Sequence, residues 1–150
     1  MRKQRRFARI ALILALFTAL VGGTVVLAVA SPAMAATCSG NGCNGLDPIA
    51  TGCQNSYTQL VGSSEIKNGS THYGWIDLRY SPTCGTNWSR VRSDIGTQNL
   101  EAFIIRTSDN LAYTESGYFQ IAWTNMVYAP TVTACAQGTI NLYGAPAVCA

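Results

Sequence analysis

Residues 65–80 read EIKNGSTHYGWIDLRY, and this stretch decides the fold predicted for the chain. Its middle, Asn68-Gly69, is the strongest two-residue signal for a β-hairpin, because both residue types accept the positive φ of a tight turn. The return strand is expected over residues 71–80, where apolar and mixed side chains alternate. The apolar set is Ile76, Leu78 and Tyr80, and the mixed set is Trp75, Asp77 and Arg79. A period of two places the two sets on opposite faces of one strand.

Short β-type runs continue along the chain on both sides of this hairpin. They cover residues 57–61, 65–67, 88–92, 100–106, 118–128, 131–134 and 139–142. No segment carries a convincing helical period of about 3.6 residues, and no internal repeat is visible. Several short strands separated by frequent turns are typical of small antiparallel sandwiches and barrels. We therefore predict an all-β fold, a small disulfide-stapled antiparallel sandwich or barrel.

The start of the chain indicates export. Residues 1–9 carry five positive charges and no acid, residues 10–30 are uncharged and apolar, and Pro32 is followed by Ala33-Met34-Ala35. This order is the signature of a secretory signal peptide. We predict that residues 1–35 are a Sec-type signal peptide cleaved after Ala35, and that the protein is secreted without a stable membrane anchor.

Two other fates of the leader stay open. Residues 10–30 are long enough to span a bilayer, so a fraction of the protein could keep them as an anchor. Arg5-Arg6 is a twin arginine, which is a weak signal for the twin-arginine route. In either case residues 36–55, a cysteine- and turn-rich N-terminal segment, are expected to fold as one unit with the β domain of residues 56–150.

Removal of the leader reverses the charge of the chain. Residues 36–150 hold five cations and all seven acids, and five minus seven gives −2. The formal net charge of +3 for the whole chain therefore comes from the leader. No basic patch is expected in the mature protein, and we predict no nucleic-acid partner.

Six cysteines fall after the leader: Cys38, Cys43, Cys53, Cys84, Cys135 and Cys149. An even count in an exported chain predicts three disulfides, for which about 15 pairings are open. Zinc sites usually contain close Cys-x-x-Cys or His pairs, and neither spacing occurs, so no metal or other cofactor is predicted. Cys53–Cys84 is one conceivable pair. The grouping of cysteines near both ends suggests a bridge that ties the termini together.

Three stretches resemble a known family. They are CNGLDPIATGC at residues 43–53, IDLRYSPTCGTNWSR at residues 76–90 and WTNMVY at residues 123–128. Together they are similar to the secreted domain-of-unknown-function family number 2690 of actinomycetes and bacilli. The resemblance implies a Gram-positive exported protein whose activity is not established, and it supplies no catalytic residues.

The sequence singles out no catalytic set. His72 is the only histidine and would have to be the base of a Ser-His-Asp or Cys-His device. Its place just after the predicted turn favours an exposed hairpin position. Two carboxylates could catalyse glycoside hydrolysis, but no feature of the sequence identifies two such acids. Asp77 is expected to form an ion pair with Arg79.

The most informative group of side chains flanks the turn at residues 81–86. Trp75, Arg79, Trp88 and Arg90 are candidate binding residues, because aromatic rings and arginines offer rigid contact area and polar groups. The structural alternative is that the two arginines stack on the two tryptophans and brace the corner at Cys84. We predict a non-enzymatic binding module for an extracellular glycan or protein at or outside the cell envelope. A small secreted hydrolase and a secreted protease inhibitor, with residues 81–86 as its loop, are the alternatives.

Overall fold

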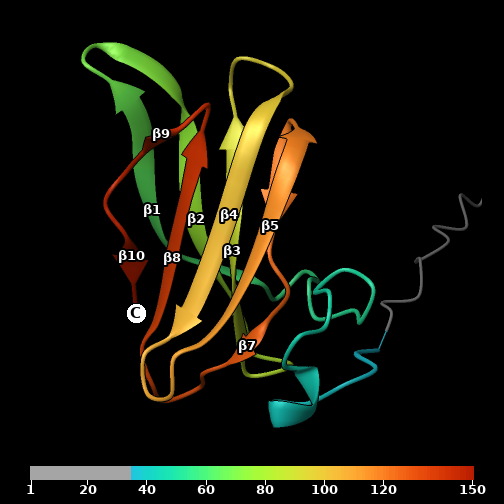
Figure 1. The fold of residues 1–150 in the computed structure, drawn as a ribbon. Coiled ribbons are helices and arrows are strands. Elements are labelled where there is room, and N and C mark those ends of the chain that lie inside the picture. Colours follow the sequence, from blue (N-terminus) through green and yellow to red (C-terminus); the bar gives the residue numbers. More distant parts are fainter. Residues whose placement is uncertain (1–34) are drawn as a thin grey trace, which may run out of the picture. The chain divides into compact units, whose positions relative to one another are not determined.

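The computed structural model describes residues 35–150, which lie within one compact unit. The predicted signal peptide, with its apolar run at residues 10–30, lies outside the described residues apart from Ala35. Two five-stranded antiparallel sheets face each other (Figure 1). This arrangement confirms the predicted all-β fold and makes it a sandwich. Within residues 35–150, no helix combines the length and apolar character that crossing a membrane requires.

The first sheet has the order β1-β2-β3-β6, and β7 also pairs with β3. Its strands are β1 (Gln59–Asn68), β2 (Thr71–Ser81), β3 (Thr86–Ser93), β6 (Ile121–Trp123) and β7 (Val127–Tyr128). The second sheet has the order β10-β8-β4-β5, and β9 also pairs with β8. Its strands are β4 (Gln98–Arg106), β5 (Leu111–Phe119), β8 (Ala134–Ile140), β9 (Tyr143–Gly144) and β10 (Val148–Cys149). A short 3-10 helix, η1 (Gly40–Cys43), lies in the N-terminal segment.

The predicted hairpin is confirmed. Asn68 pairs with Thr71 across the turn, and Gly69 has a φ of 59°. Ile76 and Leu78 of β2 are fully buried between the sheets, where they contact apolar side chains of the second sheet. The alternation seen in the sequence therefore describes the inner face of this strand correctly.

Strand boundaries differ from the prediction in three places. Residues 59–61 and 65–67 belong to one strand, β1, which residues 57 and 58 precede. The short runs predicted over residues 131–134 and 139–142 overlap the two ends of one strand, β8. The run predicted over residues 118–128 is interrupted, because β6 ends at Trp123 and β7 begins at Val127. Strand β5 was not predicted. It is a sheet edge with mostly half-buried or exposed side chains, so its sequence lacks a strong apolar alternation.

The three predicted disulfides are confirmed as Cys38–Cys43, Cys53–Cys84 and Cys135–Cys149. The Cys53–Cys84 pairing is the one suggested by the sequence. The bridge expected between the two ends of the chain is wrong. The third disulfide instead joins β8 to β10, where Cys135 and Cys149 are direct partners across the sheet.

A second core lies apart from the one between the sheets. It contains Cys43, Cys53, Cys84, Trp88 and Met126, all nearly or fully buried. Trp88 lies on the opposite face of β3 from Val91, which is in the main core. The N-terminal segment therefore covers one end of the outer face of the first sheet and leaves the rest of that face open.

Candidate functional site

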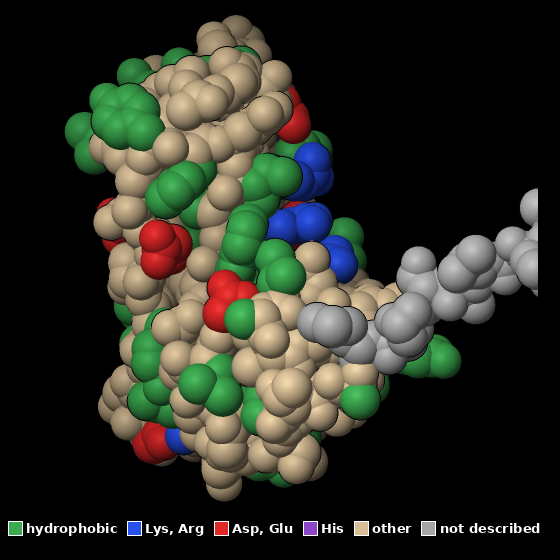
Figure 2. Space-filling model, turned by 90° about the vertical axis from the view of Figure 1, so that its right-hand side faces the viewer, with side chains coloured by type: hydrophobic (Ala, Val, Ile, Leu, Met, Phe, Trp, Pro, Cys, Tyr) green, Lys and Arg blue, Asp and Glu red, His purple; other side chains and the backbone are tan. Residues whose placement is uncertain are grey.

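The outer face of the first sheet carries a row of basic and aromatic side chains. Strand pairing places Trp75 opposite Arg92, Asp77 opposite Arg90, and Arg79 opposite Trp88. Directly paired residues of antiparallel strands project to the same side. We call the group Trp75, Asp77, Arg79, Arg90 and Arg92 the arginine face. In Figure 2, a group of basic side chains lies on the right-hand side of the upper half of the molecule.

Asp77 is the anchor of the arginine face. Its side chain is 0% exposed, and its carboxylate accepts bonds from Ser63 Oγ at 2.6 Å, Arg90 Nη2 at 2.6 Å and Arg92 Nε at 3.2 Å. Burial raises the pKa of this carboxyl, but the Ser63 and Arg90 hydrogen bonds and the two guanidinium charges lower it more. The net pKa lies below the usual value, so one buried carboxylate holds two guanidinium groups at the surface.

The ion pair predicted between Asp77 and Arg79 is wrong. The register places Arg90 directly opposite Asp77, whereas Arg79 is two residues along the same strand. The predicted stacking of Arg79 and Arg90 on tryptophans is also corrected, because the guanidinium that lies over Trp75 is that of Arg92, 5.5 Å from the ring centre. Local alternation shows which side chains share a face, but the partner is set by the register between strands.

Arg79 differs from every other cation in residues 35–150. Lys67, Arg90, Arg92 and Arg106 each form a salt bridge with an acid. Within the described residues, the guanidinium of Arg79 has neither a salt bridge nor a hydrogen bond, and its Nε is buried without a partner. Burial lowers the pKa of Arg79, the charge of Arg90 lowers it further, and Asp77 acts in the opposite direction.

Trp88 lies beneath the surface. It is 0% exposed and belongs to the second core, because the N-terminal segment packs over its ring. Its indole Nε1 is buried with no partner among residues 35–150, as is the hydroxyl of Ser81. Three of the four predicted binding residues thus lie on the arginine face, and Trp88 lies at its covered end.

His72 forms a separate polar group at the hairpin end of the sheet. Its Nδ1 is 2.8 Å from Glu65 Oε1, and its Nε2 is 2.8 Å from Asp94 Oδ2. The hydrogen bonds to Asp94 and Glu65 raise the pKa of His72 above its ordinary value. The side chain is 36% exposed. Both ring nitrogens face carboxylates, so in this arrangement neither faces a nucleophile.

A hollow of about 230 Å³ adjoins the arginine face. Its lining includes Asp47, Glu115, Phe119, Ile121, Trp123 and Asn125. Ile121 and Trp123 are the β6 partners of Arg92 and Arg90, whereas Glu115 and Phe119 belong to β5 of the second sheet. The hollow therefore lies at the edge of the sandwich between β5 and β6, beside the arginine face.

Asp47 in this hollow has a structural role. Its carboxylate accepts the Trp123 indole N–H at 2.9 Å and the backbone N–H groups of Ile49 and Ala50 at 2.7 and 2.8 Å. Burial raises its pKa, but these bonds lower it more, and the net pKa lies below the usual value. The carboxylate therefore holds the N-terminal segment against β6.

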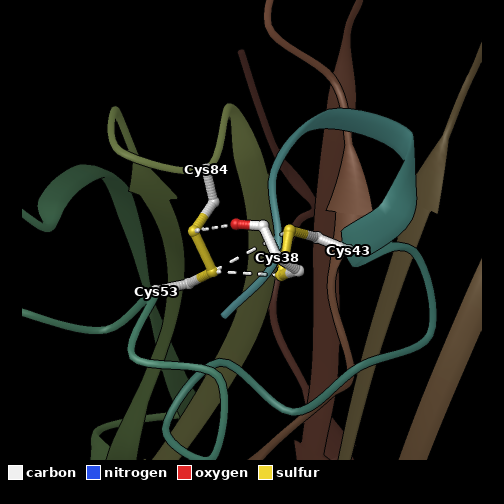
Figure 3. A group of neighbouring side chains, drawn as sticks. All are labelled: Cys38, Cys43, Cys53 and Cys84. Carbon is white, nitrogen blue, oxygen red and sulfur yellow. Dashed lines mark hydrogen bonds between the residues drawn. A yellow bond between two sulfur atoms is a disulfide. The ribbon is translucent and has the colours of Figure 1, made fainter. Parts of the chain in front are cut away.

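Four of the six cysteines lie together in or beside the second core. The Sγ atoms of Cys38, Cys43, Cys53 and Cys84 all lie within 4.8 Å of one another. Figure 3 shows the two bridges side by side, with Cys38 Sγ 3.6 Å from Cys53 Sγ. Four thiolates at this spacing would suit Zn²⁺. In the disulfide form they provide no thiolate ligand, and they close the second core covalently.

The turn considered as an inhibitory loop is short. The N–H of Gly85 donates to the carbonyl of Ser81 at 2.8 Å, and only Pro82 and Thr83 between them are exposed. Cys84 within the turn is buried in its bridge to Cys53. The turn is rigid, but it presents two residues rather than an extended segment.

Arg92 and Asp77 are the residues of this site that were not named as binding candidates. Arg92 shares the alternation of Trp88 and Arg90 along its strand, and that pattern could have identified it. The expectation that no basic patch exists is also wrong. Three of the five cations in residues 36–150 meet on one face, although they are spread over 14 positions of the sequence from Arg79 to Arg92.

Comparison with known proteins gives a family but no activity. The family model described as "Protein of unknown function (DUF2690)" matches residues 41–141. The matched range contains the arginine face and the hollow beside it. No curated protein and no solved structure matches the chain.

Proposed function

We propose that this chain, which belongs to the DUF2690 family of proteins of unknown function, is a secreted, non-enzymatic binding module that acts at or outside the cell envelope. Its partner is an extracellular glycan or protein, and the arginine face with the adjoining hollow is the contact surface. The family assigns no activity, so support for this function comes from the site.

The cysteines support secretion. All six form disulfides, and disulfides persist in oxidising compartments outside the cytosol. The signal peptide predicted over residues 1–35 agrees with this compartment. Few charged residues are available to stabilise the surface, and cross-links that restrict the unfolded chain supply stability in their place.

One observation carries the binding role: three arginines lie together on an otherwise acidic protein, and two of them, Arg90 and Arg92, are fixed by one buried carboxylate. The Asp77 carboxylate holds Arg90 and Arg92 in place before any ligand arrives. Side chains that are already ordered lose less conformational entropy on binding. A rigid, charged surface on a paired β-sheet is therefore well suited to recognition.

The same geometry supports binding over hydrolysis. Asp77 is surrounded by donors and has a lowered pKa, so it is a poor proton carrier at neutral pH. His72 has a carboxylate at each ring nitrogen. A general acid and base pair instead needs two groups whose pKa values are separated around the working pH.

Retention on a fractionated envelope tests the proposed function. The full-length chain, produced in an exporting host and purified with its disulfides intact, is incubated with insoluble cell-wall glycan and with immobilised secreted proteins. We expect retention by one fraction and weaker retention of Arg92→Gln. The matched control, Lys67→Gln, removes an equal charge at the hairpin end of the same sheet and should be retained like the wild type. Absence of retention on both fractions would contradict the binding function.

A further inference from the structure

We infer that the ligand of the arginine face is an anionic glycan, and that Arg79 bonds its carboxylate or phosphate group. This inference rests on the proposed function and names the ligand class. It is carried by the guanidinium of Arg79, which has no partner within residues 35–150.

Arg79 is the cation of residues 35–150 that has no acid partner. Four of the five cations in residues 35–150 are neutralised by acids of the protein itself. Arg79 has no acid partner within the same residues, and the carboxylate closest to it along the strand, Asp77, already accepts bonds from Ser63, Arg90 and Arg92. The positive charge that the protein leaves uncompensated is therefore located at Arg79.

Buried polar atoms without hydrogen bonds occur on Arg79 and two neighbouring residues. Within the described chain, the buried side-chain N and O atoms without a partner are Arg79 Nε, Ser81 Oγ and Trp88 Nε1. These three are neighbours, because Arg79 pairs directly with Trp88 and Ser81 lies two residues further on the same face of β2. Unpaired buried donors cost free energy. Ser81 and Trp88 are 0% exposed, so of these three residues only Arg79, which is half-buried, can meet a ligand at the surface.

The charge and shape of the Arg79 guanidinium favour an oxyanion as its acceptor. The guanidinium of Arg79 carries a fork of N–H groups that matches carboxylate and phosphate oxygens. A neutral hydroxyl could accept one bond but would leave the charge of Arg79 unpaired beside Arg90. A carboxylate or phosphate supplies both the acceptor and the missing negative charge.

The side chains of the arginine face favour a glycan over a protein as the ligand. Protein interfaces generally have an apolar core with aromatic anchors. On the arginine face, the exposed large apolar side chains are Leu60 and Ile121, which pair with Arg79 and Arg92 from the opposite margins, β1 and β6. Leu60 and Ile121 are separated by β2 and β3, and the apolar side chain beside Ile121 is Phe119 at the hollow. A polar chain with repeated charges fits such a surface, and the hollow at Trp123 and Asn125 gives space for a neighbouring sugar unit.

Titration of the protein with defined polymers tests the inference. The probes are a sugar-phosphate polymer, a uronic-acid polymer and a neutral glucan, and the readouts are affinity and the NMR signal of the Arg79 Nε–H. We expect binding to at least one acidic polymer and none to the glucan, a decrease in affinity with added salt, and a shift of the Arg79 signal. The two acidic arms show whether the oxyanion is a phosphate or a carboxylate.

Variants make the assignment to Arg79 specific. Arg79→Gln should weaken binding by at least about tenfold, the factor expected for the loss of a hydrogen bond between charged groups. Arg79→Lys should restore part of the loss, because it restores charge but not the fork, and Lys67→Gln should bind normally. Unchanged binding by Arg79→Gln, or an unshifted Arg79 signal, would overturn the inference.

The outcomes separate this inference from the proposed function. Retention of a neutral glycan or of an acidic protein alone would overturn the ligand class and leave the binding module in place. Absence of binding to envelope glycans and to secreted proteins alike would overturn both.

Discussion

At the residue scale, Asp77 holds the arginine face together, and its removal should destabilise the protein. Asp77→Asn keeps the shape of the side chain but leaves Arg90 and Arg92 without their shared carboxylate. Removing one partner of a buried ion pair costs roughly 3–5 kcal/mol. Because both arginines are partly exposed, we expect about 3 kcal/mol, measured by denaturant unfolding at neutral pH.

A pH series extends this prediction. The folded pKa of Asp77 lies below its unfolded value, so the stability it contributes is present at neutral pH and is lost as pH falls through the folded pKa. Asp77→Asn should therefore show a weaker decline of stability in acid. The exposed Glu101, which forms no salt bridge within residues 35–150, is the control, and Glu101→Gln should change stability little. An Asp77→Asn protein as stable as the wild type would contradict the anchoring role.

His72 should make stability decrease at alkaline pH. Its folded pKa is raised by Asp94 and Glu65, so its contribution is complete below the unfolded value of about 6.5. It is lost as pH rises through the folded pKa. The groups around it are Glu65, Asp94, Lys67 and the ring of Trp75.

The measurement is the melting temperature as a function of pH. The wild type should lose stability from about pH 6.5 upward, and His72→Gln should remove that part of the slope. Parallel curves for the two proteins across this range would mean that the histidine makes no net contribution through its carboxylate partners.

At the element scale, the disulfides should differ in their effect on stability. The Cys53–Cys84 bridge closes a loop with a separation of 31 residues, and Cys135–Cys149 one of 14. Chain entropy predicts losses of about 3.7 and about 3.0 kcal/mol when each is removed. Cys53 also lies in the second core, so the double variant Cys53→Ala with Cys84→Ala should be the less stable of the two pairs in denaturant unfolding.

The pairing itself is checked by peptide mapping of the unreduced protein. We expect Cys38–Cys43, Cys53–Cys84 and Cys135–Cys149, no free thiol, and no zinc in the oxidised protein. Bound zinc together with four titratable thiols would show that Cys38, Cys43, Cys53 and Cys84 work as a metal site and would contradict the disulfide pairing.

Local patterns of the strands could be predicted from the sequence, whereas contacts between strands could not. The Asn68-Gly69 hairpin and the buried face of β2 are local patterns, and both are confirmed. The edge strand β5 escaped prediction because an edge needs little apolar alternation. The partners of Asp77 could not be derived, because Arg90 and Arg92 reach it only through the register of β2 and β3. The burial of Trp88 depends on the N-terminal segment, which is more than 30 positions away in sequence.

At the scale of the whole molecule, the exported form should begin at Ala36. Expression of the full chain in an exporting host, followed by mass spectrometry of the protein in the medium, checks this. Ala36 as the first residue, with six oxidised cysteines, is the expected result. Retention of all the protein in the membrane fraction with residues 10–30 present would support the anchor alternative instead.

The arginine face differs in charge from the rest of residues 36–150. Residues 36–150 carry a net charge of −2, by five cations against seven acids, yet three of the cations lie on one face. A basic surface on an acidic protein orients the molecule toward a negatively charged partner. The arginine face is thus a property of the folded chain, which composition alone does not reveal.

An NMR map of the contact surface tests the binding role of the arginine face most directly. The labelled, oxidised protein is mixed with envelope glycan and secreted-protein fractions, and the perturbed signals are placed on the structure. We expect the perturbations to concentrate on the side chains of Trp75, Arg79, Arg90 and Arg92 and on β6. Perturbations confined to the outer face of the second sheet, or none with any fraction, would contradict it.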